Sequence, residues 1–402
     1  MVDSMAELCH LSKKKGSGGR ISGQPGDFRV EEITEGGPLK IDEKSKRTDG
    51  SGEYSVFILQ KTMWSTQDAL QTIAKALGVP MKRLSVAGNK DRNAVTVQLA
   101  SCWGMEPAKI RELRIKDITI LGCWTSDAPV KMGDLAGNRF SIRLADMSSP
   151  AAIRTIMKDT AGFVPNYFGP QRFGLRGNNP VVGKLLVEGK VDEAAMEFIC
   201  GGKDESKEAA EARRIASEDG INERTLKAFP NRLRHERTLM RHLIGKPEDY
   251  VGALRELPRN LLMIFVHSYQ SRLFNLMLSE RIRKRDLEPK IGENTCGLDR
   301  HGFINPEIRG DDVTVGRIVG YDSKPTEDEE DVLWKEGIET ANFRIRRLPE
   351  LSARGFARPL LTNVKGLKAS GKAKGSRLLV FELPKGSYAT SALRELTDVE
   401  RT

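Results

Sequence analysis

A segment in the first quarter of the chain, YSVFILQKTMWSTQDALQTIAKALGVPMKRLSVAGNKDRNAVTVQL (Tyr54 to Leu99), carries the clearest local signals for the fold. It begins with an apolar run, Tyr54 to Gln60, that has the length and composition of a buried strand. A helix with apolar residues at spacings of three and four follows. Ser65 is placed to cap its start and Gly78 to end it. The segment therefore predicts a strand that leads into a packed amphipathic helix.

The same segment continues with a charged turn between two strands. Residues 84–87 form a short apolar strand, and residues 95–99 alternate apolar with polar side chains. The turn between them places Asp91 between Lys90 and Arg92. Two flanking cations favour an ionised carboxylate, which on a rigid turn can serve as a nucleophile or a general base. An ordinary solvated turn has the same composition, because loops commonly carry charged residues.

The remaining sequence places β-rich ends around a helical middle. Short strands are predicted at Phe28–Ile33, Arg139–Leu144 and Arg377–Leu383. Helical spacing dominates residues 181–285. The acidic run 327–331 is expected to be a solvated loop. We therefore predict an α+β fold with a more helical segment between two β-rich ends.

The charge balance points to a polyanionic partner. The 402 residues include 65 Lys and Arg against 55 Asp and Glu, a formal charge of +10. This excess is spread along the chain, so it is a hint of nucleic acid and not proof. No apolar run approaches the roughly 18 residues of a membrane helix, and residues 1–20 lack the apolar core of a signal peptide. We expect residues 1–20 to be a flexible N-terminal segment, with order beginning at Ile21.

Cysteine and histidine usage argues against a disulfide framework or a metal site. The five cysteines are far apart and show no CxxC or zinc-finger spacing, and the five histidines form no HExxH motif. We therefore expect no metal and a reducing, cytoplasmic environment.

One segment resembles a phosphate-binding loop without completing it. Residues 366–373 fit GxxxxGK, but Ala373 stands where Ser or Thr must bind magnesium. A strand follows where a helix should offer its N-terminus to phosphate. We expect a flexible basic loop whose lysines contact nucleic-acid backbone, and no nucleotide cofactor. A nucleotide hydrolase is disfavoured for the same reason.

Aromatic and polar residues gather at two further places. The stretch 166–174 (NYFGPQRFG) interleaves aromatic side chains with Gln171 and Arg172, a composition suited to stacking bases and contacting phosphate. A packed aromatic turn explains it equally well. Phe140 is expected in the core, with a platform beneath a base as the alternative, and Asn138 is either a turn residue or a partner of a base or sugar.

Six motifs jointly resemble the TruD-type tRNA pseudouridine synthases, from about Ile21 to Leu396. In chain order they are PGDFRVEEI (Pro25 to Ile33), AGNKDRNAVTVQ (Ala87 to Gln98), GNRFSI (Gly137 to Ile142), NYFGPQRFG (Asn166 to Gly174), LPRNLLMIFVHSYQSRLFN (Leu257 to Asn275) and LPKGSYATSALREL (Leu383 to Leu396).

The resemblance implies a pseudouridine-synthase catalytic domain, with a mixed or antiparallel sheet, interrupted by a family-specific α+β insertion. The expected catalytic domain comprises residues 21–175 and 355–402, and the insertion comprises 176–354. It implies an isomerase that acts on tRNA, at uridine 13 by the family's usual target, without metal or cofactor.

The resemblance also assigns site residues. The catalytic aspartate falls on Asp91, the substrate-lining aromatic residues on Phe28, Phe140 and Tyr388, and the asparagine of the GNxF motif on Asn138. RNA contacts are expected from Gln171, Arg172 and Phe173. Some members carry a lysine where this chain has Ser22, and Gly26 replaces a usual glutamate. If that lysine contacts a carboxylate or phosphate, Arg20, Lys90 or Arg92 must substitute, so Lys90 and Arg92 join the predicted substrate-binding residues.

Pseudouridine formation detaches uracil from C1′ and rejoins it through C5. The nucleotide must first leave its stack, which costs a few kcal/mol that aromatic stacking can offset. Asp91 is expected to act at the ribose, either by attack on C1′ or by removal of a C2′ proton. The alternative class is a non-catalytic RNA-binding protein, which explains the charge and the aromatic residues but gives no reason for the Asp91 turn.

Overall fold

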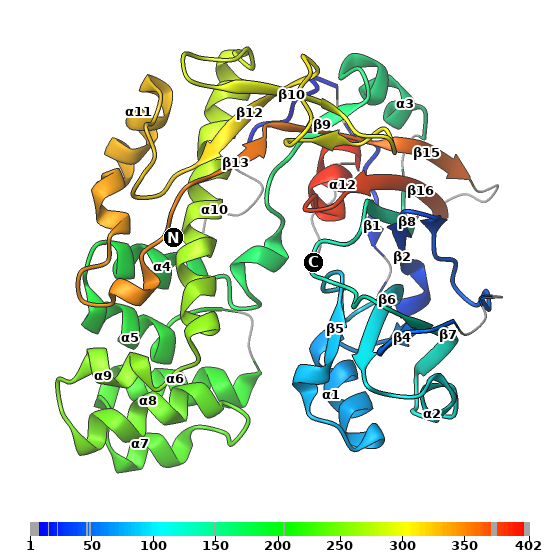
Figure 1. Cartoon of the computed structure of the whole chain (residues 1–402). Helices are drawn as coiled ribbons and strands as arrows, with labels where there is room; N and C mark the ends of the chain where they lie inside the picture. The colour runs from blue at the N-terminus through cyan, green and yellow to red at the C-terminus, as the bar shows by residue number, and fades with distance from the viewer. Residues whose placement is uncertain are drawn as a thin grey trace. The chain divides into compact units, whose positions relative to one another are not determined.

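The chain forms two compact units in a computed structural model that describes residues 8–14, 16–21, 23–45, 47, 50–147, 150–203, 206–370 and 376–397. The sheet unit comprises Ser12–Val164, Leu298–Asn305 and Leu361–Thr402. The helical unit comprises Met1–Leu11, Pro165–Gly297 and Pro306–Leu360. Each unit is thus discontinuous in sequence (Figure 1).

The sheet unit is organised around a ten-stranded sheet in the order β15-β16-β8-β2-β6-β4-β7, with β1, β3 and β5 paired at its margins. Strands β2 and β6 run parallel, and the other pairings of the described strands in this sheet are antiparallel. This mixed sheet confirms the predicted α+β class. Its elements are β1 (Arg20–Ile21), η2 (Pro25–Asp27), β2 (Phe28–Thr34), β3 (Gly37–Pro38), β4 (Tyr54–Thr62), α1 (Thr66–Leu77), η3 (Met81–Arg83), β5 (Leu84–Val86), β6 (Val95–Trp103), α2 (Pro107–Arg111), β7 (Ile118–Ser126), β8 (Gly137–Ala145), α3 (Pro150–Asp159), β9 (Phe163–Pro165), β11 (Ile304–Asn305), β14 (Leu361–Asn363), β15 (Lys365–Ser370), β16 (Ser376–Pro384) and α12 (Ala389–Thr397).

Helix α1 begins and ends as its sequence predicts. The Ser65 hydroxyl accepts a hydrogen bond from the Asp68 amide at 3.0 Å, and Gly78 ends the helix in the left-handed conformation with φ of 67°. A side chain at Gly78 would strain this conformation, whereas glycine adopts it freely. The buried face of α1 packs on β4 and β6, where Phe57, Leu59 and Ala100 share an apolar cluster with it.

A second apolar cluster covers the other half of the same sheet face. Helices α3 and α12 pack there against Phe28 of β2, Phe140 of β8 and Phe381 of β16. The strand registers put these three residues on the face that also carries Phe57 and Ala100, because paired residues point to one side and alternate residues share it. The region of this face between the two clusters is polar, and it contains the candidate site.

The helical unit packs around α10, a helix of 26 residues. At Gly183 the backbone of α4 lies so close to the Phe265 carbonyl of α10 that a side chain could not fit. The elements of this unit are η4 (Pro170–Phe173), α4 (Asn179–Val187), α5 (Val191–Cys200), α6 (Lys207–Asp219), α7 (Glu223–Ala228), α8 (Arg234–Gly245), α9 (Tyr250–Arg255), α10 (Arg259–Lys284), β10 (Asn294–Leu298), β12 (Val313–Ile318), α11 (Glu327–Glu336), η5 (Thr340–Phe343), η6 (Pro349–Leu351) and β13 (Phe356–Pro359).

Three expectations for flexible segments are corrected. The acidic run 327–331 starts helix α11, because the Glu329 carboxylate accepts the Thr326 amide at 2.8 Å and acidic residues are favourable at a helix N-terminus. The described part of residues 1–20 makes tertiary contacts, among them the Ser12 amide to a Glu395 carboxylate oxygen at 2.7 Å. Residues 365–370 form strand β15, while 371–373 of the incomplete phosphate-loop motif lie outside the described residues.

Among the described helices, none has the length and hydropathy needed to cross a membrane.

Candidate active site

The turn that carries Asp91 is held over a row of buried polar side chains. Register places this row at inward positions of neighbouring strands: Lys61 on β4 pairs with Thr96 on β6, and Glu32 on β2 pairs with Asn138 on β8. Thr96 in turn pairs with Val30, two residues before Glu32, so all of them share one face. The row separates the two apolar clusters of the sheet unit.

Two side chains fix the backbone of the turn from below. The Lys90 amide donates to the Thr66 hydroxyl at 2.9 Å, and the Gln98 amide group donates to the Gly88 carbonyl at 2.9 Å. Thr66 and Gln98 are also hydrogen-bonded to each other at 3.2 Å. Both are buried, so these bonds are shielded from competing water. The polar side of β6, which the alternating pattern predicts, is thus covered by the turn.

A third support comes from Lys61, whose side chain is fully buried. Its ammonium group donates to the Trp64 carbonyl at 2.6 Å, to the Asp91 carbonyl at 2.9 Å and, more weakly, to the Lys90 carbonyl at 3.4 Å. Burial lowers the pKa of Lys61 to about 8; the negative charge of Asp91 opposes this shift and the positive charge of Lys90 adds to it.

Lys90 itself is committed to the interior. Its ammonium group lies 2.7 Å from a Glu32 carboxylate oxygen, with side-chain exposures of 4% and 0%. The second Glu32 oxygen accepts the Leu99 amide at 2.9 Å. This side chain holds the turn against the sheet, and its predicted role in substrate binding stays a prediction. Asp91 is half-buried beside it and Arg92 is exposed, so these two remain positioned to meet a ligand.

The predicted aromatic platform is part of the core. Phe28 and Phe140 meet edge to face with ring centroids 6.3 Å apart, and Phe140 stacks on Phe381 at 5.5 Å. Phe28 is 2% exposed and Phe140 is 5% exposed. The expectation that Phe140 packs in the core is confirmed. In this conformation neither ring offers a free face to a base.

Asn138 and Tyr388 lie at the border of this core. Asn138 is half-buried, and its side-chain carbonyl oxygen is buried without a hydrogen-bond partner among the described residues. The Thr96 hydroxyl on the same sheet face is in the same state. Such groups are rare and mark places where a ligand or water completes the bonding. Tyr388 is half-buried just before α12, the helix that covers the Phe140 half of this face.

The predicted RNA-contacting motif belongs to the helical unit. Its first half is packed: Phe168 exchanges two hydrogen bonds with the Asn275 amide group, at 2.8 and 3.0 Å. Its second half forms η4, where Gln171 is exposed and Phe173 half-buried. Arg172 donates to the Ser271 hydroxyl at 3.0 Å, so it is anchored at one edge of its guanidinium group. The packed aromatic turn therefore describes the first half of the motif, and the second half is the part that is accessible at the surface.

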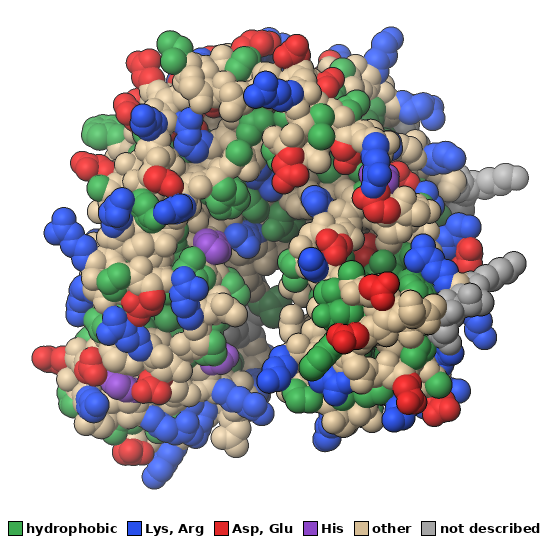
Figure 2. All heavy atoms as spheres, in the orientation of Figure 1, with side chains coloured by type: hydrophobic (Ala, Val, Ile, Leu, Met, Phe, Trp, Pro, Cys, Tyr) green, Lys and Arg blue, Asp and Glu red, His purple; other side chains and the backbone are tan. Residues whose placement is uncertain are grey.

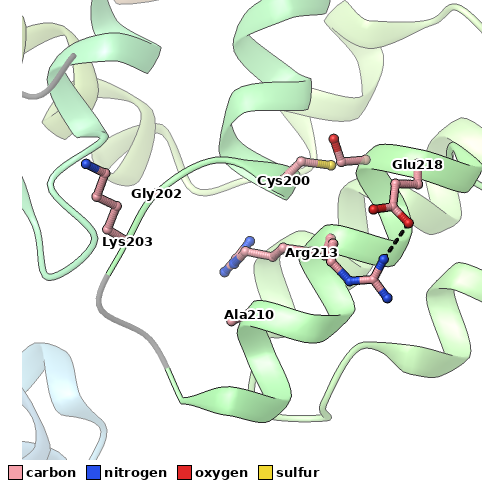
Figure 3. Close-up of a pocket in the computed structure, with 8 residues that line it drawn as sticks. Cys200, Gly202, Lys203, Ala210, Arg213 and Glu218 are labelled. Atoms are coloured by element: carbon pink, nitrogen blue, oxygen red, sulfur yellow. Dashed lines mark hydrogen bonds and ion pairs between the residues drawn. The ribbon is translucent and has the colours of Figure 1, made fainter.

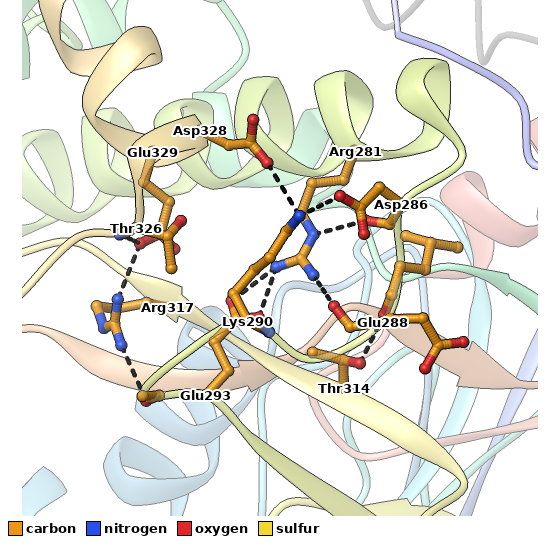
Figure 4. Close-up of polar contacts among 12 residues, drawn as sticks. Arg281, Asp286, Glu288, Lys290, Glu293, Thr314, Arg317, Thr326, Asp328 and Glu329 are labelled. Carbon is orange, nitrogen blue, oxygen red and sulfur yellow. Dashed lines mark hydrogen bonds and ion pairs between the residues drawn. The ribbon is translucent and has the colours of Figure 1, made fainter.

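The basic cluster at the end of α10 is mostly neutralised within the helical unit (Figure 4). Arg281 is buried and contacts Glu293 at 2.6 Å, while also donating to the carbonyls of Asp286 and Glu288. Lys284 pairs with Asp328 at 2.5 Å. The charge of Arg281 is therefore used inside the helical unit and is not offered to a phosphate at the surface. Lys and Arg side chains on the face shown in Figure 2 are interspersed with acidic ones and do not form one continuous patch.

A pocket of about 320 Å³ in the helical unit lies between the end of α5 and helix α6 (Figure 3). Two of its basic side chains are also paired: Arg214 contacts Glu218, and Arg213 donates to the Phe198 carbonyl and to Glu236. Among the described residues, no group of three His, Cys, Asp or Glu side chains is arranged to hold a metal ion.

Comparison with known proteins identifies the family. The family model described as tRNA pseudouridine synthase D (TruD) matches residues 5–396. The chain is 36% identical to a "Probable tRNA pseudouridine synthase D" of Methanosarcina acetivorans, covering 97% of this chain and 95% of the relative. A relative of the same name from Thermococcus gammatolerans is 36% identical, with 97% of each chain covered. A crystal structure of a TruD protein from Methanosarcina mazei superposes with a TM-score of 0.74 at 32% identity, covering 98% of this chain and 96% of that one.

The mixed sheet and these likenesses define a pseudouridine synthase, an enzyme of the isomerase class. The chain belongs to the TruD family.

Sequence reasoning missed four residues of the site: Glu32, Lys61, Thr66 and Gln98. A signal for two of them was present. Glu32 follows Phe28 and Val30 at alternate positions of β2, and Lys61 follows Phe57 and Leu59 in the same way on β4. A charged residue at an inward position of an apolar strand must find a buried partner, which makes it a site candidate.

Proposed function

We propose that this enzyme converts a uridine of tRNA, uridine 13 by the resemblance of its motifs, to pseudouridine, with Asp91 acting at the ribose of a flipped-out nucleotide. The observation that carries this proposal is the clamped turn: Thr66, Gln98 and Lys61 hold the backbone around a half-buried carboxylate. A reacting group fixed in this way needs little reorganisation when the substrate arrives.

The reaction exchanges one bond for another. The N1–C1′ bond breaks, a C5–C1′ bond forms, the C5 proton leaves and N1 takes up a proton. Asp91 acts either by attack of its carboxylate on C1′ or by removal of a C2′ proton, and both routes require the ionised form. The Asn138 carbonyl oxygen, buried and without a partner among the described residues, is suited to accept a hydrogen bond from the base or the sugar.

Phe28, Phe140 and Tyr388 would contribute to binding only if the nucleotide enters at the border of their cluster. The core positions of Phe28 and Phe140 favour a role in shaping that border, and Tyr388, which is half-buried, is the better candidate for direct stacking. Arg92, exposed beside Asp91, is suited to contact a phosphate.

We propose that the catalytic domain comprises residues 21–175 and 355–402 and that residues 176–354 form an insertion. The discontinuous sheet unit supports this division, although its first segment ends at Val164, its last begins at Leu361, and it also includes Leu298–Asn305 from within the proposed insertion. We further propose that Gln171, Arg172 and Phe173 contact RNA, and that the enzyme acts in the cytoplasm, where its five free cysteines would stay reduced.

Release of tritium from C5-labelled uridine in an unmodified tRNA transcript tests this function. Wild type should release tritium without added metal or nucleotide, and Asp91→Asn should release none while binding the transcript with similar affinity. Asp192→Asn, the same change at an exposed position on α5, is the matched control and should behave as wild type. A transcript with uridine 13 replaced by cytidine should abolish release.

Two outcomes would contradict the proposal. Turnover by Asp91→Asn would remove Asp91 from the mechanism. No release by a folded wild type that binds the transcript would point to another RNA substrate or to a non-catalytic RNA-binding protein, which a panel of labelled transcripts would separate.

A further inference from the structure

We propose that Lys61 is a positioning residue for the reaction: its ammonium ion fixes the peptide unit of Asp91 and thereby sets the orientation of the carboxylate. This inference rests on the proposed function of Asp91. Lys61 lies on the sheet beneath the turn, so it acts through Asp91 and not on the substrate.

The contacts of Lys61 join two segments that are distant in sequence. Its ammonium group bonds the Trp64 carbonyl, just after β4, and the Asp91 and Lys90 carbonyls in the turn before β6. An ammonium ion has three N–H donors and no acceptor, which matches these three carbonyl oxygens. A neutral amine offers two donors and turns a lone pair toward the third oxygen. The arrangement therefore suits the charged form.

The electrostatic surroundings make this charge sensitive to pH. The pKa of Lys61 is lowered to about 8, chiefly by burial; the negative charge of Asp91 opposes this shift and the positive charge of Lys90 adds to it. Glu32 offers no direct ion pair to Lys61, because its carboxylate is bonded to Lys90 and to the Leu99 amide. The ammonium ion is thus present at neutral pH and is lost a little above it, where the bonds to the turn should weaken.

The neighbouring cations cannot take over this role. The Lys90 ammonium group is already paired with Glu32, and Arg92 is exposed. Lys61 is the buried cation that hydrogen-bonds the carbonyl of Asp91 itself. A displacement of about 1 Å at a reacting group can reduce a rate by about 100-fold. We therefore expect a large effect on turnover and a small one on tRNA affinity.

The test compares wild type, Lys61→Met, Lys61→Arg, Asp91→Asn and the control Lys75→Met, which changes an exposed lysine on α1. For each protein the tritium-release kcat and KM are measured from pH 6 to 9.5, with transcript affinity and thermal unfolding recorded in parallel. Lys61→Met should lower kcat by about 100-fold, with KM within about threefold. Wild-type kcat should fall above about pH 8, the pKa of Lys61.

Lys61→Arg keeps its charge throughout this range, so it should restore most of the activity and lose the fall above pH 8. A fall caused by ionisation of uracil would persist in Lys61→Arg and would overturn the pH assignment. Wild-type turnover in Lys61→Met, or a flat wild-type profile, would overturn the inference. If Lys61→Met does not fold, the wild-type and Lys61→Arg profiles decide. Activity in Asp91→Asn would instead refute the proposed function.

Discussion

The buried pair of Glu32 and Lys90 gives a quantitative test of how the turn that carries Asp91 is held. Breaking a buried ion pair by removing one partner costs about 3–5 kcal/mol, because the other charge stays buried and uncompensated. Both side chains are at most 4% exposed, and Lys61 brings a second positive charge to the same region. Glu32→Gln and Lys90→Met should therefore each destabilise the turn by about 3–5 kcal/mol.

The double variant should be less damaging than the sum of the two single changes. With both charges removed, neither member of this pair is left unpaired, and the interaction energy of the cycle should be about 2–3 kcal/mol. Hydrogen exchange of peptides that cover residues 84–103, followed by mass spectrometry, reports the local opening free energy. Tritium release should fall in both single variants, because Asp91 follows Lys90 directly. Single costs below about 1 kcal/mol, or additivity within about 0.5 kcal/mol, would refute the reasoning.

Three further changes test other buried charges. The pKa of Lys61 falls from 10.5 to about 8 on folding, so the unfolded chain binds more protons than the folded chain between these pH values. The free energy of unfolding of wild type, relative to that of Lys61→Met, should therefore rise by about 3 kcal/mol from pH 8 to 10.5. Urea unfolding measures this change. Burial, Arg172 and Arg259 lower the pKa of His267, so stability should fall as pH drops below 6.5, and His267→Gln should flatten that fall in thermal melts. Arg281→Met strands the buried Glu293 and should cost about 3–5 kcal/mol in urea unfolding, whereas Arg283→Met, at a side chain 62% exposed, should cost under about 1 kcal/mol.

The part of the fold that could be predicted is the part set by local chemistry. Helix α1 begins at its predicted cap because the Ser65 hydroxyl and the Asp68 amide are neighbours in any conformation that starts a helix there. Strands β4 and β6 follow from short-range apolar patterns for the same reason. The acidic composition of residues 327–331 predicts a solvated loop, but the bond from the Thr326 amide to the Glu329 carboxylate starts a helix there.

The sequence predicts the turn that carries Asp91 but not the side chains that hold this turn in place. Asp91 stands out because its sequence neighbours are charged. Thr66 and Gln98 lie far from it in sequence and meet the turn only because it folds back over the sheet. That return is a tertiary event with no local signature. The same limit explains Lys90: sequence shows that a lysine is present but not whether its charge is already paired.

The arrangement of the site suits the two conflicting demands that the proposed role of Asp91 would impose. A carboxylate that acts at a ribose must reach its substrate, so it cannot be buried as deeply as Glu32. It must also be held in one position, because ordering a mobile turn would use part of the substrate's binding energy. The sheet unit meets both demands by separating them: Asp91 is half-buried, while the groups that fix its backbone, Lys61, Thr66 and Gln98, are buried. Burying these groups costs desolvation, which the flanking apolar clusters offset. The polar row is therefore better explained as a catalytic support than as a contribution to stability, since apolar residues of similar size would stabilise the sheet more.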